Sequence, residues 1–326
     1  MKKYNYFEYT ENIHFSICKE MKDYVSNLNS NGFIDIKKDI WHSSKDSAIN
    51  KINDPNKADF FVFPYDIGWL TDSQESSKVK KYLSLLPYYR ENEARHVFFD
   101  HGDKQKLIDL PSIFFKVSIP YNINTNSTYQ IWYDIPEHVK NDKYTFNLRN
   151  IKYHTSFVGT INNDIRKYIT KAIYLDKRIK SYIDAIEGTI KNGFYINPLL
   201  SKEEKTKRKL IFREATKKSY TVLCLPGVGP LSVRLFETMY YGRIPILIKN
   251  ISNLPRSDIV NYSEFCFFIE IDEIPNISEI INHRLSNIQS DQIAEMCEKS
   301  CRTWHTVFSK KNLNLYIARS IQKHLH

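Results

Sequence analysis

Residues 220–250, YTVLCLPGVGPLSVRLFETMYYGRIPILIKN, constrain the fold more strongly than any other part of this chain. Two short apolar runs at 220–225 and 244–248 flank a loop rich in proline and glycine and a stretch with helical periodicity. Buried strands that are joined through a helix are typical of a parallel βαβ unit. The segment therefore predicts a parallel sheet with helices packed on it.

The loop inside this segment has the composition of an anion site. Gly227 and Gly229 allow the backbone to turn tightly and to come close to a ligand. Ser232 is a good N-cap for a helix that we expect to begin near it, and Gly242 is a good stop signal. Backbone amides and the positive end of the helix dipole would then face one point, an arrangement that binds phosphate.

The alternation of strands and helices continues along most of the chain. Apolar runs at 58–66, 96–99 and 113–119 each lead into a polar segment, and a strand followed by a glycine turn restarts the pattern at 156. Polar residues just past strand ends indicate an open α/β sheet, in which the ligand lies outside the carboxyl ends of the strands.

A chain of 326 residues exceeds one ordinary domain. We predict two Rossmann-like α/β domains, at 1–150 and 151–326, with an Asn-rich connector just before the boundary. We expect one uninterrupted helix at 167–190. We also expect a long helical region at 291–324 whose last helix packs back on the first domain.

Charge and cysteine content narrow the class of protein. The net charge of +10 fits an anionic partner, although many basic residues alternate with acidic ones on expected helices. The five cysteines are scattered and form no CxxC pair, so we expect a reducing compartment and no structural zinc. The opening MKKYNYFEYT has no apolar core and no run of 18 apolar residues occurs, so we expect neither a signal peptide nor a transmembrane helix.

The common phosphate-binding fingerprints do not account for the glycine loop. Ser232 stands where GxGxxG requires a third glycine, and Asn250 stands where a dinucleotide fold has an acidic residue. Arg234 and Glu237 are more informative, because residues three apart share one face of a helix. On a surface they would form an ion pair worth about 0–1 kcal/mol. Beside the loop, the arginine would bind phosphate and the glutamate would accept hydrogen bonds from ribose.

These residues resemble the signature of the exostosin family. LCLPGVGPLSVRLFETMYYGRIPILI at 223–248 is similar to the CP-G-G-S-RLFEA…G-IPV segment that closes the family's donor site. ADFFVFPYD at 58–66 resembles the family's ADFFFVP strand, and RHVFFDHGD at 95–103 resembles its HDWG/HDHG segment. SFVGTINNDIR at 156–166 resembles its F-G…R element. The chain departs from the family at Arg256, where an aromatic residue is common.

The resemblance implies an inverting, metal-independent glycosyltransferase with two facing Rossmann-like domains and a cleft between them, the GT-B architecture. Residues 151–326 would bind a nucleotide sugar, with UDP as the favoured nucleotide, and residues 1–150 would bind a glycan or lipid-linked saccharide acceptor. The donor-binding residues that it implies are Gly159, Arg166, Gly227, Gly229, Ser232, Arg234 and Glu237. Arginines and helix dipoles would neutralise the diphosphate in place of a metal, so we expect no cofactor.

An inverting transfer needs a base that takes the proton of the acceptor hydroxyl as it attacks the anomeric carbon. We expect Asp100 or His101 to be this base, because both follow a strand predicted in residues 1–150. A turn role for Asp100 and a backbone hydrogen bond for His101 remain open as alternatives. Tyr65, Asp66 and Asp103 are further candidates on the acceptor side.

Two other functions remain open at this point. A non-catalytic polyanion-binding protein would explain the charge of +10. A dinucleotide-dependent oxidoreductase would explain the GxG that follows a strand. The favoured interpretation is a cytoplasmic enzyme with peripheral contact to an anionic inner membrane face and with no nucleic acid partner.

Overall fold

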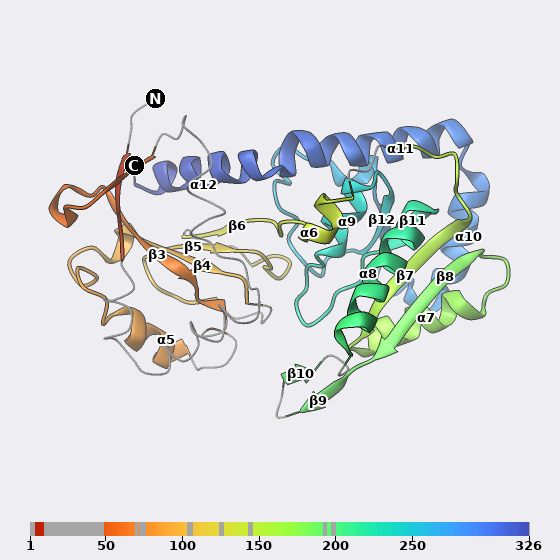
Figure 1. Ribbon diagram of the computed structural model, residues 1–326, viewed down its shortest axis with the longest axis horizontal. Coiled ribbons are helices and arrows are strands. Elements are labelled where there is room, and N and C mark those ends of the chain that lie inside the picture. Colours follow the sequence, from red (N-terminus) through yellow and green to blue (C-terminus); the bar gives the residue numbers. More distant parts are fainter. Residues whose placement is uncertain are drawn as a thin grey trace. The chain divides into compact units, whose positions relative to one another are not determined.

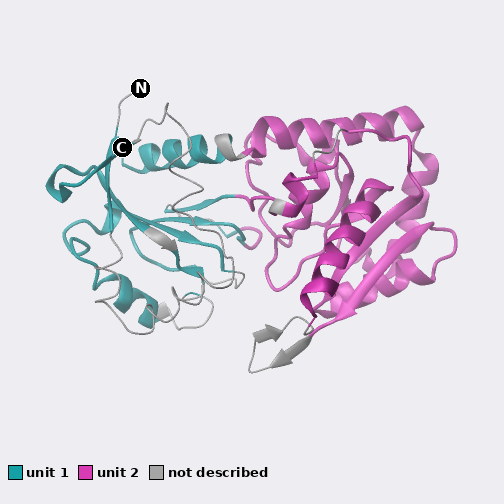
Figure 2. Ribbon diagram, in the orientation of Figure 1, with its two compact units in different colours: residues 1–119, 123–131, 310–326 teal, residues 120–122, 132–309 magenta. Residues whose placement is uncertain are grey.

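The computed structural model describes residues 4–9, 49–68, 71, 76–102, 107–123, 127–142, 146–191, 194–196 and 200–325. The chain forms two compact units, coloured separately in Figure 2. Unit 1 contains residues 1–119, 123–131 and 310–326, and unit 2 contains residues 120–122 and 132–309.

Unit 1 is built on a six-stranded sheet in which every neighbouring pair of strands is parallel, in the order β2-β1-β3-β4-β5-β6. The strands are β1 (Tyr4–Glu8), β2 (Ile49–Ile52), β3 (Phe60–Asp66), β4 (His96–Asp100), β5 (Ile113–Lys116) and β6 (Thr128–Gln130). Among the described residues of this unit, the helices are α5 (Ser76–Leu83) and α12 (Lys310–His324), of which α12 packs against β5. The core is rich in aromatic side chains, among them Phe61, Phe63 and Phe98.

Unit 2 is built on a five-stranded parallel sheet in the order β13-β12-β11-β7-β8 (Figure 1). Its strands are β7 (Tyr153–Ile161), β8 (Ser181–Glu187), β11 (Ser219–Leu223), β12 (Ile244–Ile248) and β13 (Phe267–Ile269), and β9 (Thr189–Lys191) and β10 (Phe194–Ile196) form a separate antiparallel hairpin. Its helices are α6 (Glu137–Lys140), α7 (Asp164–Leu175), α8 (Lys202–Lys217), α9 (Arg234–Tyr240), α10 (Ile277–Asn287) and α11 (Ser290–Thr303).

Short helical turns complete the description. They are η1 (Pro55–Lys57), η2 (Glu93–Arg95), η3 (Tyr262–Glu264), η4 (Ile274–Asn276) and the π-helical turn η5 (Trp304–Phe308).

The helices of unit 2 cover both faces of its sheet. α7 packs against β7 and β8 and also against α10, whereas α8 packs against β7 and β11, and α9 packs against β12 and α11. The chain runs from β7 to β8 on one side and then returns to β11 on the other side of β7. The strand order therefore reverses between β7 and β11, and ligands of open α/β sheets bind outside the carboxyl ends at such a point.

The predicted α/β fold class, two Rossmann-like units on parallel sheets as in GT-B proteins, is confirmed. The compact units differ from the predicted bounds in that residues 132–150 belong to unit 2. Residues 310–326 belong to unit 1, in agreement with the expectation that the last helix packs back on the first domain. The predicted assignment of the first unit to the acceptor and the second to the donor stays a prediction.

Two local predictions are wrong. The helix expected at 167–190 ends at Leu175, and residues 181–187 form β8, because pairing with β7 outweighs the helical pattern of this stretch. The helix expected near Ser232 is present and begins at Arg234, but Ser232 is not its N-cap: that residue is Val233, which makes no side-chain capping bond. Gly242 ends this helix as predicted, with a φ of +57°.

Candidate functional site

Arg166 joins the two loops at the reversal point of the unit 2 sheet. From the first turn of α7, its guanidinium donates to the carbonyl oxygens of Thr160 (2.9 Å), Leu225 (2.9 Å) and Pro226 (2.8 Å). One of these carbonyls belongs to the end of β7, and the other two belong to the loop after β11. The planar fork of arginine suits several acceptors at once. The structure thus shows Arg166 bracing the loops, and its predicted contact with the diphosphate stays a prediction.

Glycine residues leave space near the Arg166 side chain and in the neighbouring β7 strand. A Cβ atom on Gly227 would lie 2.9 Å from Nη2 of Arg166, and the Gly227 amide donates to the Gly229 carbonyl at 3.0 Å. A Cβ atom on Gly159 would lie 3.1 Å from the Phe157 ring. The predicted close approach at Gly227 is therefore made by a side chain of the protein itself.

Arg234 and Glu237 form a sheltered ion pair at the start of α9. Nε of Arg234 lies 3.3 Å from Oε2 of Glu237, and their side chains are only 19% and 5% exposed. The guanidinium also bonds the Val158 carbonyl and lies 4.3 Å from the centre of the Phe212 ring. Burial raises the pKa of the Glu237 carboxyl, although Arg234 acts in the opposite direction. The surface ion pair considered as the simpler alternative is thus not what the structure contains.

A pocket of about 360 Å³ opens beside this ion pair, and we name it the α8–α9 pocket. Its polar lining is mostly basic: His138, Lys205, Arg208, Lys209 and Arg234. Among the described residues, Glu237 is the one carboxylate in the lining, and Gly159 of β7 lies in the wall. A basic pocket with one buried acceptor group suits a ligand that carries both negative charge and hydroxyl groups.

The structure brings only some of the predicted donor residues to this pocket. Gly159, Arg234 and Glu237 line it. Ser232 lines a second pocket, of about 280 Å³, with Pro226, Lys249 and other residues at the ends of β11 and β12. The Ser232 hydroxyl also accepts a hydrogen bond from the Arg234 amide at 3.3 Å.

Polar side chains also meet at the carboxyl ends of β3, β4 and β5 in unit 1. The Lys116 ammonium lies 2.9 Å from Oδ2 of Asp100, and Oδ1 of Asp100 accepts the Gly102 amide at 2.8 Å. Oδ1 of Asp66 accepts the His101 amide at 2.9 Å and lies 3.5 Å from Nδ1 of His101. The two base candidates therefore have different surroundings, since Asp100 is held by a cation and His101 lies against a carboxylate.

The contacts in this cluster shift the pKa values of His101, Asp66 and Asp100. Burial acts to lower the pKa of His101, but Asp66 and then Asp100 outweigh it and raise the value above 6.5. Burial acts to raise the pKa of Asp66, but His101 outweighs it and lowers the value. Burial raises the pKa of Asp100 against the opposing effect of Lys116. An imidazole beside a carboxylate in this way can hold and release a proton near neutral pH.

The remaining acceptor-side candidates are less informative. Tyr65 lies on β3, but its side chain is outside the described part of the structure, and Asp103 lies outside the described residues altogether. Sequence reasoning missed Lys116 and the pocket residues His138 and Lys209. A lysine inside the apolar run IFFKVSI was a usable signal for Lys116, whereas no local pattern marks His138.

Among the described residues, no helix is long and apolar enough to cross a membrane. No group of three or more His, Cys, Asp or Glu side chains among them is arranged to hold a metal ion.

The sheets and the α8–α9 pocket define a Rossmann-like α/β protein with a candidate anion pocket in its second unit. A family model described as the Exostosin GT47 domain matches residues 4–283, and the chain belongs to this family of glycosyltransferases. The resemblance found in the sequence is thereby confirmed.

Individual relatives are distant. The chain is 25% identical over 121 residues to the probable glucuronosyltransferase GUT1 of Oryza sativa subsp. japonica, a match that covers 37% of this chain and 28% of that protein. It is 22% identical over 254 residues to the probable glycosyltransferase At5g25310 of Arabidopsis thaliana, a match that covers 70% of this chain and 49% of that protein. The chain thus spans half or less of these relatives.

Among solved structures, the crystal structure of Anabaena Alr3699/HepE in complex with UDP is similar over 99% of this chain and 100% of that one, with 11% identity and a TM-score of 0.47.

Proposed function

We propose that this protein is an inverting glycosyltransferase that moves a sugar from a UDP-sugar to a hydroxyl of a glycan or polysaccharide acceptor, without a metal. The observation that carries the proposal is the buried Glu237 carboxylate in the otherwise basic α8–α9 pocket. Membership of the exostosin GT47 family supports the reaction class, and the names of the plant relatives point the same way.

In this proposal the nucleotide lies in the α8–α9 pocket. The Glu237 carboxylate accepts hydrogen bonds from the ribose hydroxyls, because a carboxylate offers only acceptors and a diol offers two donors. Arg234 and Lys209 attract the diphosphate, and bonds between charged partners are stronger than neutral ones. Arg166 and Ser232, predicted to meet the diphosphate, act in this scheme through the loops they hold.

We propose His101 rather than Asp100 as the base. Asp100 already accepts hydrogen bonds from Lys116, Gly102 and Thr71. His101 takes the acceptor proton while the acceptor oxygen bonds to the anomeric carbon, and the bond from that carbon to the phosphate oxygen breaks with its electron pair leaving on UDP. Asp66 steadies the imidazolium that results.

In this proposal, the net charge supports the class of acceptor and the location. The net charge of +10 suits an acidic glycan or a lipid-linked saccharide at an anionic membrane face. Sedimentation with liposomes that contain or lack anionic lipid tests the membrane contact, which is contradicted if both are bound equally.

Calorimetric titration of UDP into the wild type and Glu237→Gln tests the proposed function. Because bonds to charged groups are worth about 1.5–3 kcal/mol, Glu237→Gln should weaken UDP binding by about ten- to a hundredfold. Glu214→Gln is the matched control, since Glu214 lies on α8, pairs with Lys218 at 2.9 Å and does not line the pocket. Equal UDP affinity in the wild type and Glu237→Gln would contradict the proposal.

A further inference from the structure

His138 lies in the lining of the α8–α9 pocket, on the four-residue helix α6. No motif in the sequence marks it as a site residue. Its side chain is half-buried, and within the described part of the chain its ring makes no hydrogen bond that holds it in place. The ring nitrogens are therefore available to a ligand in the pocket.

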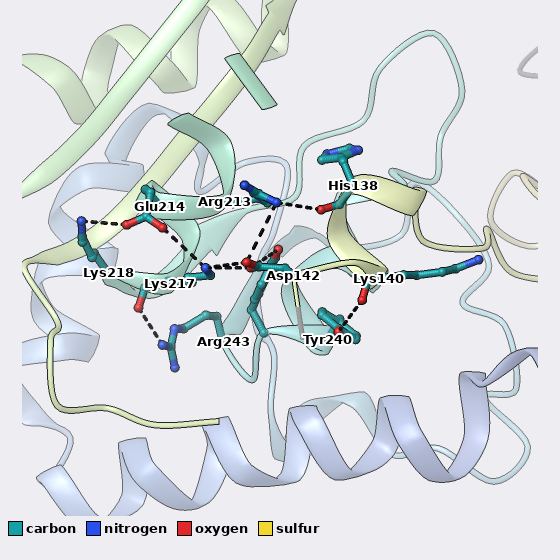
Figure 3. Close-up of polar contacts among 10 residues, drawn as sticks. His138, Lys140, Asp142, Arg213, Glu214, Lys217, Lys218, Tyr240 and Arg243 are labelled. Atoms are coloured by element: carbon teal, nitrogen blue, oxygen red, sulfur yellow. Dashed lines mark hydrogen bonds and ion pairs between the residues drawn. The ribbon is translucent and has the colours of Figure 1, made fainter. Parts of the chain in front are cut away.

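The backbone beneath His138 is held firmly. Nη1 of Arg213 donates to the His138 carbonyl at 3.1 Å and lies 3.9 Å from Oδ1 of Asp142 (Figure 3). On the far side of α6, the Tyr240 hydroxyl donates to the Lys140 carbonyl at 3.5 Å. Figure 3 shows the His138 ring directed away from Asp142, on the other side of its own carbonyl.

Asp142 is the centre of the network that holds α6. Its carboxylate lies 2.7 Å from Nζ of Lys217 and accepts a hydrogen bond of 3.0 Å from the Tyr241 hydroxyl. The Asp142 side chain is only 13% exposed. Arg213 bonds to the His138 carbonyl and lies near Asp142. The Asp142 carboxylate therefore helps to fix the position of His138 through Arg213.

The charged groups that line the pocket around His138 are mostly positive. Among the described lining residues, α8 contributes Lys205, Arg208 and Lys209, and α9 contributes Arg234 and the one carboxylate, Glu237. Arg213 of α8 lies behind His138, near the Asp142 carboxylate. Burial lowers the pKa of His138, and Lys209, Arg213 and Arg234 lower it further. The imidazole is therefore neutral near pH 7.5. An anion that enters the pocket cancels this positive field and makes protonation of the ring easier.

We propose that His138 contacts the diphosphate of the bound nucleotide and takes up a proton when the nucleotide binds, and that Asp142 is the residue that positions it. The proposal rests on the proposed function, because it places a nucleotide in the α8–α9 pocket. It adds a ligand contact from a segment outside the family-like motifs. It also makes nucleotide affinity depend on pH, with tighter binding as pH falls through the range in which the ring becomes protonated.

Calorimetry of UDP binding at pH 7.5, in buffers of low and high ionisation enthalpy, measures the proton uptake directly. The wild type should take up a fraction of a proton per UDP, and His138→Asn should lose that uptake and bind UDP several-fold more weakly. UDP brings its own titrating phosphate equally to both proteins, so the difference between them reports on His138. His154→Asn is the matched control, because His154 on β7 also has a pKa lowered by burial but does not line the pocket.

The positioning role has its own readout. Asp142→Asn should lower both the proton uptake and the UDP affinity while near-UV circular dichroism stays native. If Asp142→Asn does not fold, Tyr241→Phe removes one of the bonds that hold the carboxylate and tests the same point. An Asp142 variant that takes up protons and binds UDP as the wild type does would overturn the positioning role.

The outcomes separate the two proposals. Equal proton uptake in the wild type and His138→Asn overturns the role of His138, even if Glu237→Gln abolishes UDP binding and so supports the proposed function. Absence of UDP binding to the wild type overturns the proposed function and this inference with it. Loss of uptake in His138→Asn alone, with His154→Asn unchanged, supports both.

Discussion

Lys116 and Asp100 form a buried ion pair in unit 1, with Nζ 2.9 Å from Oδ2 and side chains only 1% and 4% exposed. The pair joins the last residue of β5 to the last residue of β4. A second bond from Nζ of Lys116, to the Gly102 carbonyl at 3.0 Å, fixes the loop that carries His101. Asp100 therefore helps to position the loop that carries the candidate base, and removal of its cation should destabilise the fold.

Lys116→Met should destabilise the protein by about 3–5 kcal/mol, because it leaves the Asp100 carboxylate buried without its cation. Urea denaturation measures the loss. Lys80→Met is the control, since the Lys80–Asp109 pair is on the surface and is worth about 0–1 kcal/mol. Similar losses in the two variants would show that the buried pair is not structurally important.

Gly68→Ala should be more damaging to stability than Gly227→Ala. A Cβ atom on Gly68 would lie 2.2 Å from the Gly102 backbone nitrogen, which cannot move independently. The contact at Gly227 is with the end of the Arg166 side chain, which can shift if it gives up some of its bonds to carbonyls. We expect a loss of about 3 kcal/mol or more for Gly68→Ala. Gly227→Ala should cost less stability than that and should weaken UDP binding. The reverse order in thermal denaturation would contradict this reasoning.

Asp66→Asn should move the acid limb of kcat/KM to lower pH. The proposed base works as a neutral imidazole, and Asp66 raises the pKa of His101 by stabilising its protonated form. Activity in the wild type should therefore rise as pH increases through a value above 6.5. Without the carboxylate the imidazole loses its proton at lower pH, and kcat should fall because the imidazolium is no longer stabilised. An unchanged acid limb would rule out His101 as the titrating base.

The same pair predicts how stability depends on pH. The raised pKa of His101 gives stability that is fully present below the unfolded value of about 6.5 and is lost as pH rises through the folded value. The lowered pKa of Asp66 gives stability that is present above about 3.9 and is lost as pH falls. The difference in unfolding free energy between the wild type and Asp66→Asn should thus be largest from about pH 4 to 6.5. A flat difference from pH 4 to 8 would contradict the pairing.

Sequence patterns predicted the parts of this protein that depend on local composition. The apolar runs of β3, β4, β11 and β12 are short, rich in β-branched or aromatic residues and bounded by turn residues, and these features distinguish a buried strand from a helix. β8 was missed because its sequence, SYIDAIE, also fits a helix and becomes a strand through pairing with β7. The sequence motif around Glu237 allowed this residue to be predicted as a site residue. His138 could not be predicted, because its position in the pocket depends on Arg213, which is 75 residues further along the chain.

Arg166→Lys should separate the bracing role of Arg166 from a purely electrostatic role. Lysine keeps the positive charge but cannot reach three carbonyls at once. Each part-buried carbonyl that loses its hydrogen-bond donor should reduce the unfolding free energy by about 1–3 kcal/mol. We expect a lower unfolding midpoint and weaker UDP binding, since the loops after β7 and β11 are no longer tied together. Arg178→Lys is the control for the exchange itself, because Arg178 is 60% exposed and pairs with its near neighbour Asp176. It should leave both measurements unchanged. If Arg166→Lys keeps wild-type stability and affinity, the positive charge alone accounts for the residue and the bracing role fails.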